Sequence, residues 1–424
     1  MGHDKESGQG TEGMLAPYRA LDLTTERGYL CGRILGDLGA DVIKIERPGG
    51  DPGQNMGPFY KDIPDPEKSL FRFAFNGNKR GITLDIETIR GREIFKRLIA
   101  DADFVIESFA PGYMDSLGLG YSELSRINPG IITASITPFG QSGPYRNYKS
   151  SDLVDAALSG ILYINGDPDR PPVRVSFPQT FHLGAAEAAV GILMALQYRH
   201  ETGEGQQVET QVQRAGVVTT FDILSWWEGH KQIRKRRGSV RIIPQSGVKA
   251  EQMWRCKDGF VSFFFFGGRM GLTSNQALVK WMENEGQVDD FIREVDWDKL
   301  DWSKVTQDYV DKFQEPVSRF FLAHTKAELL EGAVERGIQI YPLSIAEDML
   351  NSRQLEAREY WTEVEHPELG TSITYPGAFI KSSEAPISMR YRAPTIGEHN
   401  GEIYKGELGF SDKDLIILKQ GNVI

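Results

Sequence analysis

Cysteine is scarce in this 424-residue chain, which contains only Cys31 and Cys256. Two cysteines are too few for a disulfide framework and suit a reducing compartment. The seven histidines are scattered, without an i, i+4 pair or a nearby cysteine, so no metal site is predicted. No apolar run approaches the ~18 residues needed to cross a membrane. Residues 1–13 are polar and glycine-rich and lack the apolar core of a secretory signal. We therefore expect a cytoplasmic protein with a disordered N-terminal tail and no membrane contact.

Positive charge is also in deficit. The chain carries 48 lysine and arginine side chains against 59 aspartate and glutamate, which gives a formal net charge of −11. This balance argues against nucleic acid as the main partner, although local basic patches remain able to hold a small anion. Apolar residues make up 40% and charged residues 25%, as in globular proteins that bury a real core. A disordered, collagen-like or disulfide-stapled protein is excluded.

The N-terminal half alternates strand-like and helix-like segments. Strands are expected at 18–23, 41–46, 81–84, 104–107 and 131–135, and helices at 27–36, 87–100 and 185–199. Such alternation predicts βαβ units, in which helices cover both faces of a parallel sheet. The helix at 185–199 is apolar nearly all round and is therefore expected to be buried. The predicted fold class is α/β, with a Rossmann-like large domain.

The composition changes after residue 215, where tryptophans and a basic run interrupt the alternating pattern. Beyond this point, a compact apolar strand and further helices indicate a second, smaller α+β domain. We expect the following division: a disordered tail at 1–13, the N-terminal part of the large domain at 14–215, a linker at 216–234, the small domain at 235–340, and a linker with a C-terminal return to the large domain at 341–424.

The sequence matches two known motifs only in part, a dinucleotide-binding motif and a hydrolase motif. Glu46 ends the second strand where a dinucleotide-binding fold places its ribose-binding acid, but the preceding turn reads TTERG at 24–28 rather than GxGxxG. Without those glycines a pyrophosphate approaches the backbone poorly, so NAD or FAD is not expected. The segment GQSGP at 140–144 resembles a hydrolase elbow, but a proline follows where a helix must begin, so Ser142 is not a predicted nucleophile.

Clusters of positive charge mark the places where a small anion is expected to bind. Arg47 closes the second strand, at the carboxyl end where open α/β sheets bind their ligands. Lys79 and Arg80 follow an Asn-Gly-Asn turn just before the third strand. The densest basic run extends from Lys231 to Arg241. It has two interpretations: a solvated loop between domains, or a contact for phosphates, substrate carboxylates or an acidic partner.

Six segments stand out in order along the chain. They are GRILGDLGADVIKIERPGGD at 32–51, NGNKRGITLD at 76–85, SFAPGYMDSLGLGY at 108–121, FGQSGPY at 139–145, GILMALQYRHETGEGQQVETQVQRA at 191–215 and APTIGEHN at 393–400. Together they resemble the family III CoA-transferases, which include formyl-CoA transferase, carnitine CoA-transferase and, as a relative, α-methylacyl-CoA racemase. The resemblance covers nearly the whole chain from about residue 14, and six segments in one order make it specific.

The resemblance implies a large α/β domain built from both chain ends, a smaller domain, and two chains that interlock like links. It implies a coenzyme A thioester as substrate and no covalently bound cofactor, with CoA lying along the strand ends of the large domain. Carried over by position, it places Arg47 and Lys79 at CoA phosphates, Ser108 and Phe109 beside the adenine, and Thr25, Arg27 and Phe139 beside the pantetheine and thioester.

One departure from the family pattern decides the predicted role. In the family, an aspartate shortly before the buried helix attacks the acyl-CoA thioester and forms a mixed anhydride with release of the CoA thiolate. The thiolate then attacks the anhydride, which gives an aspartyl-CoA thioester and frees the acid. The matching position falls at about Phe181, and residues 176–184 contain no carboxylate. The nearest acid, Glu187, lies downstream on the apolar helix, where packing or a buried ion pair is the competing interpretation. No catalytic residue is therefore predicted, with Glu187 as the alternative.

Three interpretations follow from this departure. The favoured one is a subunit that is not catalytic alone and pairs with a homologous catalytic subunit in an interlocked heterodimer or heterotetramer. That enzyme would move CoA between a dicarboxylic acyl-CoA such as succinyl-CoA and an acid such as (R)-benzylsuccinate, as in anaerobic aromatic degradation. The second is an active transferase with a displaced nucleophile. The third is a CoA-binding protein or racemase relative, which Ser151 and Phe181 disfavour because the racemase branch has histidine and aspartate there.

Overall fold

The computed structural model describes residues 13–243, 246–265 and 268–424, and the chain forms two compact units. The first unit takes the chain up to Ile161, together with Arg174–Lys231 and Arg353–Ile424. The second unit takes Leu162–Val173 and Gln232–Ser352. Each unit has its own hydrophobic core.

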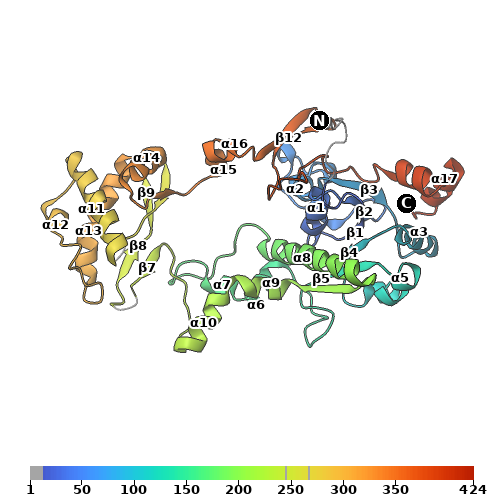
Figure 1. The fold of residues 1–424 in the computed structure, drawn as a ribbon, viewed down its shortest axis with the longest axis horizontal. Coiled ribbons are helices and arrows are strands. Elements are labelled where there is room, and N and C mark those ends of the chain that lie inside the picture. Colours follow the sequence, from blue (N-terminus) through green and yellow to red (C-terminus); the bar gives the residue numbers. More distant parts are fainter. Residues whose placement is uncertain (1–12, 244–245, 266–267) are drawn as a thin grey trace, which may run out of the picture. The chain divides into compact units, whose positions relative to one another are not determined.

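The first unit is built on one six-stranded sheet in the order β3-β2-β1-β4-β5-β6, and every neighbouring pair is parallel (Figure 1). Its strands are β1 (Arg19–Leu23), β2 (Asp41–Glu46), β3 (Lys79–Thr83), β4 (Phe104–Glu107), β5 (Ile132–Thr137) and β6 (Gln207–Gln211). The predicted α/β fold class is confirmed, because short apolar strands alternate with helices and parallel pairing requires a crossover after each strand.

Helices cover both faces of this sheet. The helices in this part of the chain are α1 (Tyr29–Asp37), α2 (Leu70–Asn76), α3 (Ile89–Ile99), α4 (Tyr113–Ser116), α5 (Tyr121–Ile127), α6 (Asp152–Leu158), α8 (Gln179–Thr202), α9 (Val212–Thr219) and α10 (Phe221–His230), with the short turns η1 (Pro52–Asn55), η2 (Tyr60–Asp62) and η3 (Pro66–Lys68). Of these, α10 contains no buried residue. Most of α7 (Ile161–Ile164) belongs to the second unit. Successive strand residues point to opposite faces. Ala20 and Val42 therefore pack in the core beneath α1 and α8, whereas Leu21 and Ile43 pack in the core beneath α3 and α5.

Helix α8 starts earlier than the predicted 185 because its N-terminus is capped from another helix. The Asp152 side chain on α6 accepts hydrogen bonds from the Thr180 backbone N–H (2.9 Å) and hydroxyl (2.6 Å). A helix start leaves N–H groups without intrahelical partners, and this carboxylate satisfies one of them. Phe181 consequently lies in the first turn of α8 rather than before it. By length and composition α8 is apolar enough to span a membrane, but half of that apolar window is buried within the unit.

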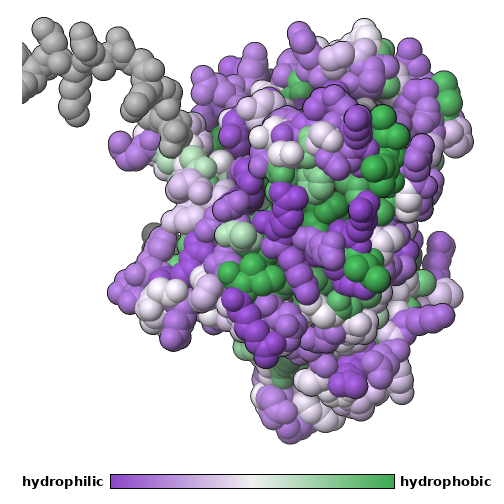
Figure 2. Space-filling model, turned by 90° about the vertical axis from the view of Figure 1, so that its right-hand side faces the viewer, coloured by the Kyte–Doolittle hydropathy of each residue, from purple (hydrophilic) through white to green (hydrophobic). Residues whose placement is uncertain are grey.

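The C-terminal segment returns to the first unit and covers the outer edge of the sheet. It contains α16 (Arg353–Ala357), the hairpin β12 (Trp361–His366) and β13 (Thr371–Pro376), η4 (Gly401–Glu407) and α17 (Asp412–Gln420). The His399 backbone N–H donates to the Gly81 carbonyl (2.9 Å), and the Asn400 side chain accepts from the Thr83 N–H (2.9 Å), so the free edge of β3 is paired. The face of the molecule seen in Figure 2 is mainly hydrophilic, with hydrophobic residues between polar ones.

The second unit packs helices against short antiparallel strands. Its elements are β7 (Val240–Ile242), β8 (Lys249–Glu251), β9 (Met253–Cys256), β10 (Gly259–Ser262), β11 (Tyr341–Pro342), α11 (Gly268–Asn284), α12 (Asp290–Arg293), α13 (Gln307–Ala323), α14 (Lys326–Arg336) and α15 (Ala346–Leu350). The core is rich in aromatic rings that meet edge to face; Trp254 contacts Phe321 in this way, with ring centroids 5.6 Å apart. Of the tryptophans near the basic run, Trp254 is buried and belongs to this core.

Buried charges hold the end of β1 against α1 and β2. The Lys79 ammonium is fully buried and donates to the Asp22 carboxylate (2.8 Å), the Tyr29 carbonyl (2.9 Å) and the Asn76 side chain (2.9 Å). Lys44, also buried, donates to the Thr24 carbonyl and forms an ion pair with a further buried carboxylate, Asp51 (3.1 Å). A Cβ at position 32 of α1 would lie 2.2 Å from the Asp22 carboxylate, so this approach requires glycine there.

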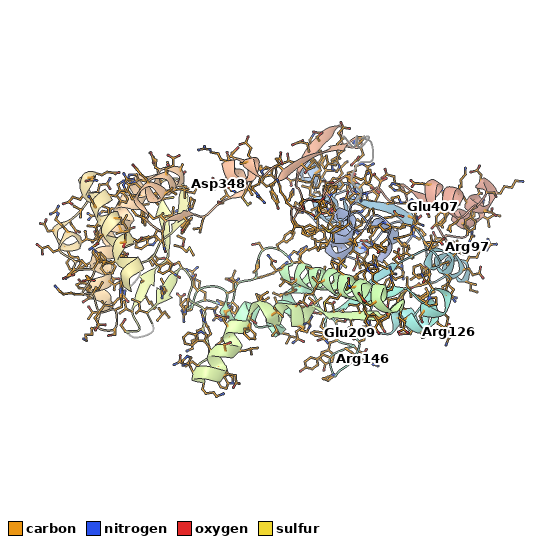
Figure 3. All side chains as sticks on the ribbon, viewed as in Figure 1. Arg97, Arg126, Arg146, Glu209, Asp348 and Glu407 are labelled. Carbon is orange, nitrogen blue, oxygen red and sulfur yellow. The ribbon has the colours of Figure 1, made fainter. Side chains whose placement is uncertain are left out.

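We predict that Lys79→Met lowers the free energy of unfolding by about 3–5 kcal/mol, because it leaves the Asp22 charge buried without its main partner. Urea denaturation of the purified chain measures this loss. The double variant Lys79→Met with Asp22→Leu should recover part of it, since both charges are then removed. Arg126→Ala is the control: this arginine on α5, labelled in Figure 3, forms only an exposed pair with Glu123. A loss below about 1 kcal/mol for Lys79→Met would contradict this account.

Candidate functional site

The strand order places a topological switch point between β1 and β4, and a ligand crevice is expected at the carboxyl ends of these strands. From β1 the chain builds β2 and β3 on one side, and from β4 it builds β5 and β6 on the other. In open parallel sheets, the carboxyl ends of the strands at such a switch point form the ligand site. Two of the predicted CoA contacts meet there: the Thr25 N–H donates to the Ser108 hydroxyl (2.9 Å), and the two hydroxyls lie 3.3 Å apart.

Arg27 stands beside this pair, in the turn between β1 and α1. Its guanidinium donates to the Ser108 carbonyl (3.4 Å) and lies over the Phe181 ring, 5.1 Å from the centroid. Phe181 is 5% exposed and packs in the core beneath α8. The structure therefore brings together Thr25, Arg27, Ser108 and Phe181, which are far apart in the sequence.

Two buried carboxyl groups, which the sequence did not single out, border the crevice. Glu107 ends β4, and burial raises its pKa to about 8 although its carboxylate accepts a hydrogen bond from the Phe109 N–H (2.7 Å). Asp155 on α6 is fully buried, and burial raises its pKa to about 6 against the opposing effects of Ser150 and Arg27. One Asp155 oxygen accepts from the Ser150 hydroxyl (2.6 Å), while the other has no partner among the described residues. An acid that closes an otherwise apolar strand, FVIE at 104–107, was the available signal for Glu107.

Arg47 lies at the carboxyl end of β2, as predicted, and its side chain is 56% exposed. Its guanidinium contacts the Glu87 carboxylate and donates to the Tyr113 hydroxyl (3.1 Å). The Tyr113 ring in turn packs on Phe109, with centroids 4.7 Å apart. An exposed cation and two aromatic rings thus line one end of the carboxyl edge, an arrangement that suits a phosphate beside a base.

Lys79 and Phe139 occupy different surroundings. The three donors of the Lys79 ammonium are taken by protein acceptors in the core, so we do not retain it as a phosphate contact. The turn before β3 looked accessible in sequence, but the side chain extends inward to Asp22. Phe139 follows β5, is buried, and contacts the Tyr145 ring edge to face at 6.0 Å. In the same loop, the Gln141 N–H donates to Glu209 of β6 (2.9 Å), which Figure 3 labels.

An aromatic cluster adjoins the start of α8. It consists of Phe71, Phe75, Phe177 and His182. The rings of Phe177 and His182 stack at 5.0 Å, and those of Phe75 and His182 lie 4.5 Å apart. Phe177 is 42% exposed, so the cluster opens to the surface. Burial lowers the pKa of His182, and its Nε2 has no partner among the described residues. The sequence did not predict this cluster, because α2 and the start of α8 are distant along the chain.

Comparison with known proteins agrees with this geometry. The sequence model described as CoA-transferase family III matches residues 15–400. The chain belongs to CoA-transferase family III. Membership implies a CoA thioester as substrate, and the crevice between β1 and β4 lies where the fold places a ligand.

Relatives within the family cover nearly the whole chain. The succinyl-CoA:(R)-benzylsuccinate CoA-transferase subunit BbsE of Thauera aromatica is 35% identical, over 91% of this chain and 92% of its own. The succinyl-CoA–D-citramalate CoA-transferase of Chloroflexus aurantiacus is 30% identical, over 94% of each chain. The succinyl-CoA–L-malate CoA-transferase beta subunit of the same organism is 28% identical, over 97% and 98%. These relatives are named for succinyl-CoA as one substrate, and two of them are named as subunits.

A solved structure shares the fold. The crystal structure of a CAIB/BAIF family protein from Brucella suis superposes with a TM-score of 0.78 and 24% sequence identity, over 93% of this chain and 99% of that one. At this identity the likeness concerns the fold alone. The Rossmann-like architecture of the first unit is thus that of the family.

The basic run, apart from Lys231, belongs to the second unit. Arg236 donates to three backbone carbonyls, those of Tyr163 (3.0 Å), Asp167 (3.3 Å) and Arg170 (3.3 Å). Arg241 lies over the Phe264 ring at 4.9 Å. At least these two members of the run stabilise local structure.

The buried Glu107 carboxyl should make the free energy of unfolding of the chain depend on pH. Its pKa rises from 4.5 to about 8 on folding, so between these values the native chain keeps a proton that the unfolded chain has lost. Unfolding free energy should therefore fall with rising pH across this window, by about 1 kcal/mol per pH unit. We predict that Glu107→Gln, which can still accept the Phe109 hydrogen bond, flattens this profile and is more stable than the wild type at pH 8.

Urea midpoints between pH 5 and 8 measure both profiles. The matched control is Glu123→Gln on α5, whose side chain is far more exposed and which should leave the slope unchanged. Parallel profiles for Glu107→Gln and the wild type would show that the Glu107 proton does not contribute.

Proposed function

We propose that this chain is the non-catalytic subunit of a heteromeric family III CoA-transferase, paired with a homologous catalytic subunit in the cytoplasm. The enzyme transfers CoA from succinyl-CoA to a carboxylic acid such as (R)-benzylsuccinate. The BbsE subunit of Thauera aromatica, which carries this reaction in its name, supports the proposal through 35% identity over nearly the full length of both chains. We propose that this chain shapes and stabilises the assembly.

The observation that carries the proposal is the residue at the start of α8. The position matched to the family nucleophile is occupied by Phe181, whose ring has no group able to attack a thioester. The surrounding first turn, from Gln179, contains no carboxylate. We therefore propose that no covalent transfer passes through this position in this chain.

Two acids near the start of α8 could in principle replace the missing nucleophile, but one forms an ion pair and the other is buried. Glu187, the alternative nucleophile, forms an ion pair with Arg214 of α9 at 2.5 Å, and its side chain is 28% exposed. Such pairing and its position on α8 favour a role in fastening two helices. Asp155 is fully buried, so a thioester cannot reach it without rearrangement. These facts favour the subunit interpretation over an active transferase with a displaced nucleophile.

The residues predicted to contact CoA, apart from Lys79, are consistent with a chain that still binds CoA, with full or reduced affinity. Arg47, Phe109 and Tyr113 would receive the phosphate and base, and Thr25 and Ser108 would border the pantetheine at the crevice. The aromatic cluster at Phe177 and His182 offers an apolar, ring-lined surface beside the start of α8. This surface suits an acid that carries an aryl group better than a purely aliphatic one.

Exposed apolar side chains on three consecutive helices support a partner subunit, and Val218 on α9 is one of them. Val190, Met194 and Tyr198 lie one turn apart on the outer face of α8, and Met194 is 69% exposed. On α10, which contains no buried residue, Phe221 and Trp227 are also exposed. Apolar patches of this kind mark protein interfaces. We assign this surface, the α8–α10 face, to the homologous subunit, which would interlock with this chain.

We predict that this chain contains no covalently labelled carboxylate when incubated with succinyl-CoA, whether alone or with its partner. Hydroxylamine trapping followed by mass spectrometry of peptides should place any hydroxamate on the homologous subunit only, and the chain alone should show no transfer. Glu187→Gln should leave the pattern of the mixed oligomer unchanged. Turnover by the chain alone, or a hydroxamate on any of its own acids, would overturn the proposal.

We predict that Met194→Glu reduces formation of the mixed oligomer at least tenfold, because it places a charge in the centre of the α8–α10 face. Co-expression with the homologous subunit and native mass spectrometry measure assembly. The control is Ile417→Glu on α17, which changes an apolar residue that is also exposed (51%) and lies outside this face. Equal assembly by both variants would remove the face from the interface.

A further inference from the structure

An arginine with unused donors lies where the family reaction centre is expected. Arg27 lies just after the carboxyl end of β1, and among the described residues its guanidinium donates one hydrogen bond, to the Ser108 carbonyl (3.4 Å). Among the described residues, no carboxylate lies within ion-pair distance of this guanidinium, and its buried Nε has no partner. By contrast, Arg33 and Arg72, which are buried nearby, each contact a carboxylate. A partly buried guanidinium with free donors is expected to gain an anion.

The surroundings hold Arg27 in place while they occupy only one of its donors, the N–H group that contacts the Ser108 carbonyl. The Phe181 ring lies beneath the guanidinium at 5.1 Å and supports it by a cation–π contact. Asp155 attracts the cation, but its carboxylate lies beyond ion-pair distance of the guanidinium, and one of its oxygens is engaged by Ser150. The fixed position and the open fork of N–H groups are the features of an arginine that binds a carboxylate through two parallel hydrogen bonds.

Other donors converge on the same place. The hydroxyls of Thr25 and Ser108 lie 3.3 Å apart beside Arg27, and only one of them is needed to donate to the other. Glu107, at the end of the neighbouring strand, is largely protonated at neutral pH because burial raises its pKa to about 8. At Phe181 no negative charge repels an incoming anion. The site thus offers a cation and, at Phe181, lacks the negative charge that a nucleophilic carboxylate would present; the buried Asp155 is the acid that remains beside Arg27.

We propose that Arg27 binds the carboxylate of the free acid, substrate or product of the transfer, in the crevice between β1 and β4. This inference rests on the proposed function for the identity of the acid, a dicarboxylate of the succinate type. The anion is held and not transformed, so the crevice of this subunit is a binding site for the acid. Its occupation joins the carboxyl ends of β1 and β4 with the first turn of α8.

The test is calorimetric titration of the full chain, in its complex if it purifies as one, with succinate, with the uncharged analogue succinamide and with CoA. Wild type should bind succinate and not succinamide. Arg27→Gln should weaken succinate binding by about 10- to 100-fold, as expected for loss of a charge-assisted pair, and change CoA affinity by less than about threefold. Arg126→Gln, on exposed α5, should change neither.

Two further variants keep the test decisive if Arg27→Gln disturbs the fold. Phe181→Asp should supply an internal partner for Arg27 and abolish succinate binding, whereas Phe181→Leu should retain it. Circular dichroism verifies that each variant is folded. Unchanged succinate affinity in Arg27→Gln, or a loss of CoA affinity with succinate binding intact, would overturn the proposal; the second result would make Arg27 a phosphate contact. Because binding needs no turnover, transfer activity of the chain alone would refute the proposed function without affecting this result.

Discussion

The buried ion pair between Lys79 and Asp22 is the constraint on which the site depends. It joins β1 to β3 across the strand between them, and the neighbouring Lys44 fixes the carbonyl of Thr24. Because Asp22 accepts from Thr24 and Lys79 donates to the Tyr29 carbonyl, the pair fixes both ends of the turn at 25–28 that carries Thr25 and Arg27. Charges of this kind are expensive to bury, so all of their hydrogen-bonding capacity must be met by the surrounding chain. The position of the crevice is thereby fixed by groups that never contact a ligand.

The sheet itself was readable from the sequence. Strands at 41–46 and 104–107 have the predicted bounds, because their apolar residues are continuous and turns flank them. The helix α8 was predicted too short, since its first turns depend on a carboxylate from α6, and such a cap is invisible in local sequence. The predicted large domain at 14–215 included Leu162–Val173, which the structure places in the second unit. This placement depends on contacts with Gln232–Ser352, which are distant in the sequence.

The candidate site divides in the same way. Arg47 was predictable, because a basic residue at the end of a parallel strand faces the ligand edge whatever the rest of the fold does. Lys79 was not, because a long side chain near a turn can extend outward to an anion or inward to a carboxylate 57 positions away. Glu107, Asp155 and the ring cluster at Phe177 depend on burial and on neighbours from distant segments, which only the folded chain supplies.

The pairing of β3 with the residues around Asn400 has a consequence for biosynthesis. A ribosome must translate almost the entire message before the strand that begins at Lys79 receives its covering segment. Throughout that interval the nascent polypeptide displays an open row of backbone donors and acceptors, the kind of template on which other chains aggregate. Truncation shortly before residue 399 should therefore harm solubility more than the small number of missing residues suggests, and chaperone engagement is expected to last until termination.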